Sequence, residues 1–394
     1  MQLKPFLLDA WLDQYEHNIE FNLAASTGPV WTVNDILALA DDETRHRFFH
    51  HKLVYSRPAG ADSLREAIAE MQHVPVETVL VVTGASEALV ALMWLAAEAG
   101  ANVIIPQPGY PPFSALPESL GLETRFYRVR RENGFRIDPD EIKRLADFNT
   151  KLILVNSPHN PTGATISDAE MEALHDFAAE RGIQLVSDEV YHPIYHGRPT
   201  KSAARLAHAT VISDMSKAFS IAGVRIGWII EHDAQRRQQY WNARATFSIS
   251  NNTIGEILSE IAVRNRDAVI GKAQEAATRN LKLLERFMAD HNDILGWIPP
   301  QGGMTAFPWL RAGENGGEKV AGASGRDKEK TTVENARPFC QAAAEHGILL
   351  APGDCFNEPP HFRLGFAAAG DNFPNALTRF SAFIKTWSRK MVPA

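Results

Sequence analysis

The sequence predicts an α/β fold, with a large domain built on a mainly parallel seven-stranded sheet and a smaller α+β domain. Three observations favour it. Between residues 79 and 230, short apolar runs alternate with longer amphipathic ones, the pattern of strands joined by helices that cover both faces of a sheet. Residues 233–292 carry no strong strand signal. After residue 297 short strand and helix patterns mix again, which indicates the second domain.

Most predicted strands of the sheet are short, largely apolar runs bounded by turn-forming residues. The run at 79–82 precedes a helix at 86–98, where alanines and leucines recur at helical spacing and Gly100 is the stop signal. The next strand, at 103–105, is expected to end at Pro106. The other strands are expected at 124–129, 151–155, 183–186, 211–212 and 226–230, with a helix that begins near Asp168.

The rest of the chain is predicted from weaker signals. Consecutive helices are expected over 233–292 with an interruption near 250–252, then strands at 304–309 and 362–366 and helices at 334–345 and 375–390. The Gly- and charge-rich residues 311–332 are expected to form a mobile surface insertion. We therefore expect residues 1–40 to form an N-terminal arm and part of the small domain, 41–285 the large domain, and 286–394 the C-terminal small domain.

The composition narrows the function. The chain has 394 residues, 45% of them hydrophobic and 22% charged, which is ordinary for a globular protein. The net charge of −7 does not indicate binding to nucleic acid or to an anionic membrane, which positively charged proteins favour. Cys340 and Cys355 are the only cysteines, so a disulfide framework is excluded and no metal site is expected. With no recognisable signal peptide or membrane span, we expect a cytoplasmic protein.

Polar residues follow the predicted strands at the edge where α/β sheets bind ligands. The turn Gly84, Ala85 and Ser86 opens a helix, and backbone N–H groups at that end favour an anion such as phosphate. Arg225 lies beside the last strand and can clamp a phosphate through two N–H groups. Tyr110, in a stiff proline-rich turn, can lie over a flat ligand.

Four further positions add the remaining chemistry. Asn160, in the turn after the fourth strand, offers an amide to a ligand oxygen, as Tyr191 offers a hydroxyl. Asp188 ends an apolar strand and therefore requires a cationic partner. Lys217 stands alone among apolar residues, where a poorly hydrated amine is suited to attack an aldehyde. A ligand with a phosphate, an aldehyde, a hydroxylated flat ring and a basic ring nitrogen satisfies all of them, and pyridoxal 5′-phosphate is that ligand.

The segments NSPHNPTG, SDEVY and SKAFSIAGVRIGW, together with YSRPAGADSLREAIA from residue 55, are specific in this combination. With them the chain resembles the class I/II aminotransferases, which have pyridoxal-phosphate fold type I, over about residues 22–366. The resemblance implies an enzyme of amino-acid metabolism that moves an amino group between an amino acid and a 2-keto acid. It also implies a homodimer with shared active sites.

The same resemblance implies roles for individual residues. Lys217 is expected to form a Schiff base with the cofactor and then to act as the base, Asp188 to pair with the ring nitrogen, and Tyr110 to stack on the ring. Arg363 is expected to grip the α-carboxylate of the substrate, with Asn160 beside it. Further cofactor contacts are expected from Gly84, Ala85, Ser86, Asn160, Tyr191, Ser216, Arg225 and, reaching in from the neighbouring subunit, Tyr55.

Two departures from the family pattern stand out. Asp214 occupies the position, three residues before the lysine, where many members carry a serine that bonds the phosphate. A carboxylate is repelled by phosphate, so we expect Asp214 to point away, or to bond through water or a protonated neighbour. Residues 24–29 align ambiguously with the family's N-terminal substrate loop.

Other functions stay open at this stage. The same Lys217 and Asp188 would serve a pyridoxal-phosphate-dependent lyase or cyclase, similar to a C–S lyase or to capreomycidine synthase. A sensor domain of a transcription regulator would need an upstream DNA-binding domain, for which we expect no room before residue 22. No arginine stands out as the partner of a side-chain carboxylate, and Trp31, Phe247 and Trp309 favour a neutral or aromatic amino donor.

Overall fold

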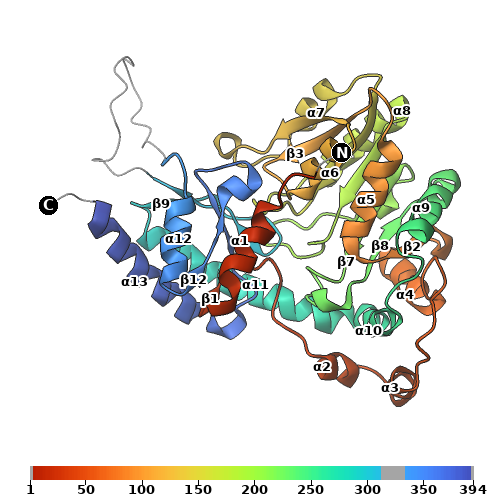
Figure 1. Cartoon of the computed structure of the whole chain (residues 1–394), viewed down its shortest axis with the longest axis horizontal. Helices are drawn as coiled ribbons and strands as arrows, with labels where there is room; N and C mark the ends of the chain where they lie inside the picture. Colours follow the sequence, from red (N-terminus) through yellow and green to blue (C-terminus); the bar gives the residue numbers. More distant parts are fainter. Residues whose placement is uncertain (1–2, 312–332, 392–394) are drawn as a thin grey trace.

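The computed structural model describes residues 3–311 and 333–391, so the predicted insertion lies outside the described residues except for its first position. A seven-stranded sheet forms the centre of the molecule, in the order β2-β8-β7-β6-β5-β3-β4 (Figure 1). Six of these strands run in the same direction and only β8 runs the opposite way, so the predicted mainly parallel sheet is confirmed. The strands are β2 (Val79–Val82), β3 (Asn102–Gln107), β4 (Glu123–Arg128), β5 (Thr150–Asn156), β6 (Gln184–Asp188), β7 (Ala209–Asp214) and β8 (Gly227–Ile230).

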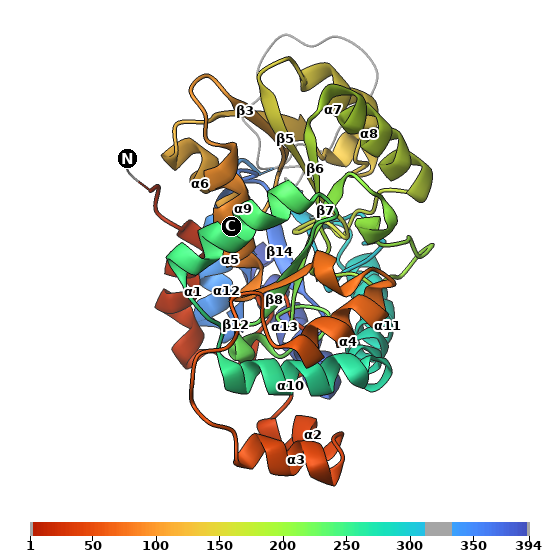
Figure 2. The ribbon, with the colours of Figure 1, turned by 90° about the vertical axis from the view of Figure 1, so that its right-hand side faces the viewer.

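Helices cover both faces of this sheet (Figures 1 and 2). In β2, Leu80 and Val82 pack into the core under α5 (Gly84–Ala96), α6 (Pro112–Ser119) and α9 (Ala234–Phe247), whereas Val79 and Val81 pack into the core on the opposite face. Because successive side chains point to opposite faces, a strand that is buried on both faces, such as β2, is apolar throughout, whereas the edge strand β4 carries charged residues. On the opposite face or at its rim lie α4 (Asp62–Gln72), α7 (Pro139–Leu145), α8 (Asp168–Arg181), α10 (Thr253–Arg264) and α11 (Arg266–Asp290).

One strand boundary is wrong. The structure continues β3 through Pro106 to Gln107, paired with β4 as far as Arg128. Pro106 lies beyond Ile104, the last residue of β3 in register with β5, so the missing N–H interrupts little of the ladder.

The C-terminal part of the chain builds the smaller α+β unit, and the N-terminus joins it (Figure 1). The strand β1 (Phe21–Asn22) pairs in parallel with β12 (Ile348–Leu349), while α1 (Leu7–Tyr15) lies beside α12 (Arg337–Glu345). The predicted single strand at 304–309 is wrong, because Pro308 separates two short strands that pair with different partners. These are β10 (Thr305–Ala306) with β14 (Phe362–Gly365), which also pairs with β13 (Ala351–Pro352), and β11 (Trp309–Leu310) with β9 (Leu295–Gly296).

The helices of the second half of the chain and a projecting pair, α2 and α3, complete the molecule. The predicted interruption near 250–252 separates α9 from α10, and residue 285, the predicted domain boundary, falls inside α11. The chain ends on α13 (Phe373–Met391), and α2 (Val33–Ala38) and α3 (Asp42–Phe49) project beyond α10 (Figure 2). Among the described residues, no helix combines the length and the apolar character needed to cross a membrane.

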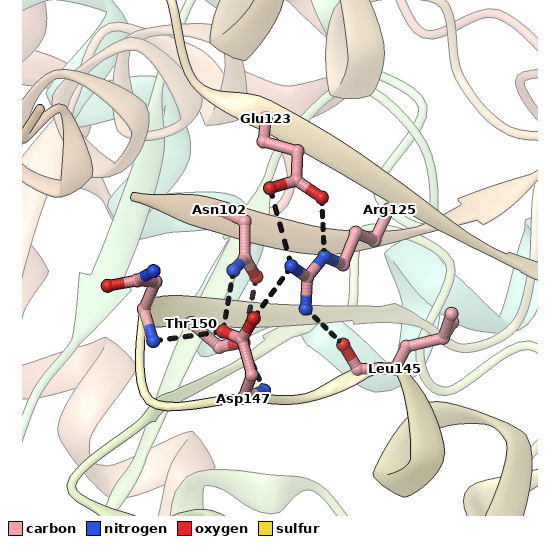
Figure 3. Close-up of polar contacts among 7 residues, drawn as sticks. Asn102, Glu123, Arg125, Leu145, Asp147 and Thr150 are labelled. Atoms are coloured by element: carbon pink, nitrogen blue, oxygen red, sulfur yellow. Dashed lines mark hydrogen bonds and ion pairs between the residues drawn. The ribbon is translucent and has the colours of Figure 1, made fainter. Parts of the chain in front are cut away.

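A polar cluster fixes the loop between α7 and β5 at the edge of the sheet opposite the strand ends that bind ligands (Figure 3). Asp147 accepts hydrogen bonds from Asn102 Nδ2 at 2.9 Å and from Arg125 Nη2 at 2.7 Å. Arg125 also donates to the carbonyl oxygen of Leu145 at 2.7 Å, and Thr150 Oγ1 donates to Asn102 Oδ1 at 2.7 Å. The Asn102 amide, and after it the Arg125 guanidinium, lower the pKa of Asp147 to about 2.

We expect Asp147→Asn to change the acid stability of the protein. A carboxyl whose pKa is depressed on folding stabilises the native state above its unfolded pKa, near 4, and loses that contribution as the pH falls toward about 2. Melting curves followed by circular dichroism should therefore show the variant less stable than the parent at pH 6, with the difference shrinking toward pH 2. A constant difference across this range contradicts the argument, and Glu77→Gln, an exposed carboxyl outside the cluster, is the control.

Candidate active site

A cavity of about 330 Å³ opens at the C-terminal ends of β5, β6 and β7. Parallel strands bring residues far apart in sequence to this one edge, because each strand delivers its following loop to the same side. Nine of the predicted site residues line the cavity: Ala85, Ser86, Tyr110, Asn160, Asp188, Tyr191, Ser216, Lys217 and Arg225. A larger hollow of about 430 Å³, lined in part by Met71, Phe219 and Trp228, lacks this combination of a lysine, an arginine and carboxylates.

The anion-binding end of the cavity depends on a glycine. Gly84 has a φ of +72°, in the left-handed region, and opens helix α5. A Cβ atom at this position would lie 2.7 Å from Nη2 of Arg225, so only glycine lets the guanidinium approach the helix N-terminus. The N-terminus of α5, Ser86 and Arg225 therefore border the same end of the cavity, which suits a phosphate group.

One expected arrangement had Asp214 pointing away from the cavity, and the structure does not show it. Asp214 lines the cavity, and its carboxylate accepts hydrogen bonds from Ser216, at 2.8 Å from the backbone N–H and at 2.9 Å from Oγ. The N–H of Ala85 lies 3.4 Å from the same carboxylate. Donors from the helix N-terminus and from Ser216 thus satisfy Asp214, which stabilises a carboxylate next to the anion-binding end.

The buried carboxyl of Asp188 lies in an environment that favours a cation beside it. It is buried at the end of β6 and accepts a hydrogen bond from the N–H of Val190 at 3.2 Å. Burial raises the pKa of Asp188 to about 7, and the nearby carboxylates of Asp214 and Glu189 add to the effect. A protonated ring nitrogen placed against this carboxyl would reverse the effect, because an opposite charge favours the ionised form.

The N-terminal loop at residues 24–29, whose alignment with the family is ambiguous, contacts both Lys217 and Arg363. Lys217 Nζ donates a hydrogen bond to Ser26 Oγ at 2.8 Å. Arg363, on β14, donates to the carbonyl oxygen of Ala24 at 2.7 Å and to Asn160 Oδ1 at 3.2 Å. Residues 24–26 therefore lie between the predicted lysine and the predicted carboxylate-binding arginine, and Ser26 is a site residue that sequence reasoning missed.

Arg363 has the character of a carboxylate receptor. It is fully buried and stacks over the ring of Phe356 at 5.1 Å, yet no described carboxylate forms an ion pair with it and its Nε has no hydrogen-bond acceptor. Burial lowers the pKa of Arg363. A buried cation without an anionic partner is costly, so the position is best explained by an anion that the protein itself does not supply.

Asn156 is a second residue that sequence reasoning missed, although it begins the segment NSPHNPTG. Its Nδ2 donates to the backbone carbonyl of Asp188 at 3.1 Å, and its Oδ1 accepts from the backbone N–H of Asn160 at 2.8 Å. One side chain therefore fixes the two strand ends that carry the predicted ring contacts.

The two tyrosines of the cavity differ. Tyr191 is buried and its hydroxyl has no partner among the described residues, so it can donate to a ligand oxygen. Tyr110 packs edge-on against Phe113, with ring centroids 5.7 Å apart. Burial raises the pKa of Tyr110 to about 12, with a further contribution from the charge of Asp9, so its hydroxyl stays protonated at neutral pH.

Some expected residues lie elsewhere. Tyr55 is 81% exposed and is not among the residues that line this cavity. The aromatic residues Trp31, Phe247 and Trp309 do not line it either, whereas Asp9 of α1, which sequence reasoning did not consider, does.

These residues fit pyridoxal 5′-phosphate. The unpartnered Tyr191 hydroxyl, the Asp188 carboxyl with its raised pKa and the cradle that admits only glycine at position 84 correspond to its ring oxygen, ring nitrogen and phosphate. The amine of Lys217, bonded only to a neutral hydroxyl, is available to its aldehyde.

Comparison with known proteins agrees with this chemistry. The profile of the family "Aminotransferase class I and II" matches residues 21–377. The chain is 25% identical to capreomycidine synthase from Streptomyces vinaceus, over 97% of this chain and 94% of the relative. It is 29% identical to the aspartate/prephenate aminotransferase of Thermus thermophilus, over 86% of each. A PLP-dependent aminotransferase from Streptococcus suis has the same fold, with a TM-score of 0.86 at 24% identity, covering 98% of this chain and 99% of the other.

Proposed function

The chain belongs to the class I and II aminotransferase family and is a pyridoxal-phosphate-dependent enzyme that moves an amino group between an amino acid and a 2-keto acid; from this premise we propose that Lys217, Asp188 and Arg363 carry its chemistry. The observation that supports the proposal most is that one cavity is lined by a lysine, a buried carboxyl that calls for a cation and an arginine at a helix N-terminus.

When bound, pyridoxal phosphate supplies an aldehyde that joins amines and a ring that accepts the electron pair left on the α-carbon of the substrate. Lys217 would hold the cofactor through this aldehyde, and its Nζ, once free, would be the general base for the α-proton of the substrate. Ser26 keeps Nζ in place through the 2.8 Å hydrogen bond. The same Nζ would also be the acid that gives the proton back, so one amine would serve both proton transfers.

The other residues bind and orient. Asp188 holds a proton at the ring nitrogen, which makes the ring the better electron acceptor. Tyr191 and Asn160 donate hydrogen bonds to the ring oxygen, and Tyr110 packs on the ring. Arg363 binds the α-carboxylate of the substrate, and Asn160, which already contacts Arg363, lies beside it. The phosphate is held by Gly84, Ala85, Ser86 and Arg225, and by Ser216 when its hydroxyl turns from Asp214 to the phosphate.

We also propose that the enzyme is a homodimer with shared active sites. The segment between α3 and α4 exposes the apolar side chains of Leu53, Val54 and Tyr55, and Phe49 at the end of α3 is exposed as well. Contiguous exposed apolar residues on a projecting segment are typical of an interface. A second copy that covered this segment would bring Tyr55 to the phosphate of the neighbouring site.

The cysteines support a location in the cytoplasm, which we propose as well. Cys340 and Cys355 are both buried free thiols. Burial raises the pKa of each thiol, so neither is readily oxidised. A chain without a disulfide between its described cysteines is suited to a reducing compartment.

A cyclase is the second candidate, because the similarity to capreomycidine synthase extends over 97% of the chain. The early steps would use the same lysine and carboxyl, and the two reactions diverge only after the α-proton has been removed. Asp214, which replaces the usual serine in the phosphate cradle, sets this chain apart from many aminotransferases and is compatible with either outcome.

A panel of amino acids distinguishes the two functions. We expect the purified holoenzyme, given single amino donors without a keto acid, to convert its cofactor to the pyridoxamine form and to release the matching 2-keto acid. Adding a 2-keto acid should restore the original spectrum, and sedimentation of the same preparation should give a dimer. Release of ammonia, or a cyclised product with no pyridoxamine form, would instead assign the chain to elimination or cyclisation.

A further inference from the structure

A carboxylate from the N-terminal helix lines the active-site cavity without a role in the reaction described above. Asp9 belongs to α1, and the charges of Lys217 and Arg363 act on it while its own charge acts on Tyr110. No described group donates a hydrogen bond to Asp9 or forms an ion pair with it. Partial burial raises its pKa, as expected of a carboxylate that lacks a cationic partner of its own.

Contacts with the rest of the protein fix helix α1, and with it Asp9, in place. Trp11 is 2% exposed, and its Nε1 donates to the carbonyl oxygen of Leu350 at 2.8 Å. The guanidinium of Arg337 lies 5.0 Å from the Trp11 ring, and Phe6, just before the helix, packs edge-on against Tyr110 at 5.8 Å. The helix thus contacts both the small unit and the loop that carries Tyr110, on either side of the cavity.

The charges of the cavity leave Asp9 unassigned. Arg225 faces the phosphate, Asp188 the ring nitrogen, and Arg363 the α-carboxylate of the substrate. Asp214 is bonded to Ser216 and next to the N–H of Ala85. Among the described residues that line the cavity, Asp9 is the charge left without an assignment on the substrate side, and it is negative.

We propose that Asp9 is a specificity-determining residue that selects amino donors with a cationic side chain, that is, an amine or a guanidinium. The inference rests on the proposed function. A substrate whose α-carboxylate lies on Arg363 and whose amine lies at Lys217 directs its side chain toward the mouth of the cavity, where the Asp9 carboxylate lies open to solvent. A charge-assisted hydrogen bond there favours a basic donor over a neutral one of the same shape.

The preference for acidic residues at helix N-termini does not account for the position of Asp9. Acidic residues are favoured in the first turn of any helix, and Asp9 lies in the first turn of α1. The helix dipole acts equally on residues of that turn that face solvent, so it does not explain a carboxylate in this cavity. This proposal of a basic amino donor differs from the expectation of a neutral or aromatic donor, which was based on aromatic residues that do not line the cavity.

Arginine and citrulline test the proposal, because they differ in charge but hardly in shape. We expect the holoenzyme to show a higher kcat/KM for arginine than for citrulline, and Asp9→Asn to lower kcat/KM for arginine by roughly tenfold to a hundredfold, mostly through KM. The value for citrulline should change less than about threefold. Asp13→Asn, the same charge change one turn along α1 and outside the cavity, should leave both donors unaffected.

Binding without turnover gives an independent measurement. Calorimetry with 5-guanidinopentanoate, which lacks the reactive amine, should show weaker binding to the Asp9→Asn holoenzyme, and 5-ureidopentanoate should bind both proteins alike. Equal losses for charged and neutral compounds would mean that Asp9 supports the fold, and would overturn the proposal. If the variant fails to fold, a parent enzyme that prefers citrulline to arginine overturns it as well. An enzyme that transaminates neither donor but accepts others refutes the specificity alone, whereas one that transaminates no amino acid refutes the proposed function.

Discussion

Lys217→Ala is expected to lower the transamination rate by at least about 10⁴-fold, because it removes both the amine that holds the cofactor and the general base. Stopped-flow measurement of the first half-reaction, from amino donor to pyridoxamine form, isolates the step that the lysine carries out. The variant should still fold and bind the cofactor, since the phosphate is held by the N-terminus of α5 and by Arg225.

The control for this variant is Lys201→Ala, which removes an exposed lysine outside the cavity and should leave the rate unchanged. A Lys217→Ala protein that loads the cofactor and retains more than about a hundredth of the parent rate would refute the assignment of the base. Partial recovery of the rate by added small primary amines would support it, because a diffusible base can then occupy the space of the lost side chain.

Asp188→Asn is expected to lower the rate by about 10³-fold. A charge pair at about 4 Å is worth roughly 4 kcal/mol at an effective dielectric of 20, which corresponds to about three powers of ten in rate if the protonated ring nitrogen is required in the transition state. An amide of the same shape cannot hold that proton. Asp188→Glu keeps the charge and should retain more activity than Asp188→Asn, although its longer side chain displaces it.

The raised pKa of Asp188 also makes the cofactor-free protein sensitive to pH. A carboxyl whose pKa rises on folding, from its ordinary value of 3.8 to about 7, stabilises the native state below the unfolded pKa and loses that contribution as the pH rises through 7. The melting temperature of the cofactor-free protein should therefore fall between pH 5 and 8 more steeply than that of its Asp188→Asn variant. Parallel melting curves for the two proteins would show that the carboxyl does not titrate in this range.

The sheet and its ligand-binding edge were predictable because their signals are local. A strand buried on both faces is an uninterrupted apolar run, and the residue after it necessarily lies at the common edge of a parallel sheet. Asp188 and Lys217 could be placed in one site for this reason, although no contact between their loops was known. The same reasoning placed Asn160 and Tyr191 beside them, and all four line the cavity.

The remainder of the site depends on contacts that no local pattern encodes. Ser26 lies 191 residues from Lys217 in sequence, and it reaches the amine because β1 pairs with β12. Asp9 enters the cavity because Trp11 docks α1 on the small unit. Two-residue strands such as β10 and β11 are too short to show a periodicity, so the predicted strand over 304–309 merged them.

The central claim, a covalent link between Lys217 and pyridoxal phosphate, is tested most directly by borohydride reduction followed by tryptic digestion and mass spectrometry. Trypsin cleaves after Arg205, Lys217 and Arg225, and a reduced phosphopyridoxyl group on Lys217 blocks the middle cut. We predict a single modified peptide spanning residues 206–225 in the reduced holoenzyme, and the separate peptides 206–217 and 218–225 when reduction is omitted. A phosphopyridoxyl group on any other lysine, with residue 217 cleaved normally, would contradict the account.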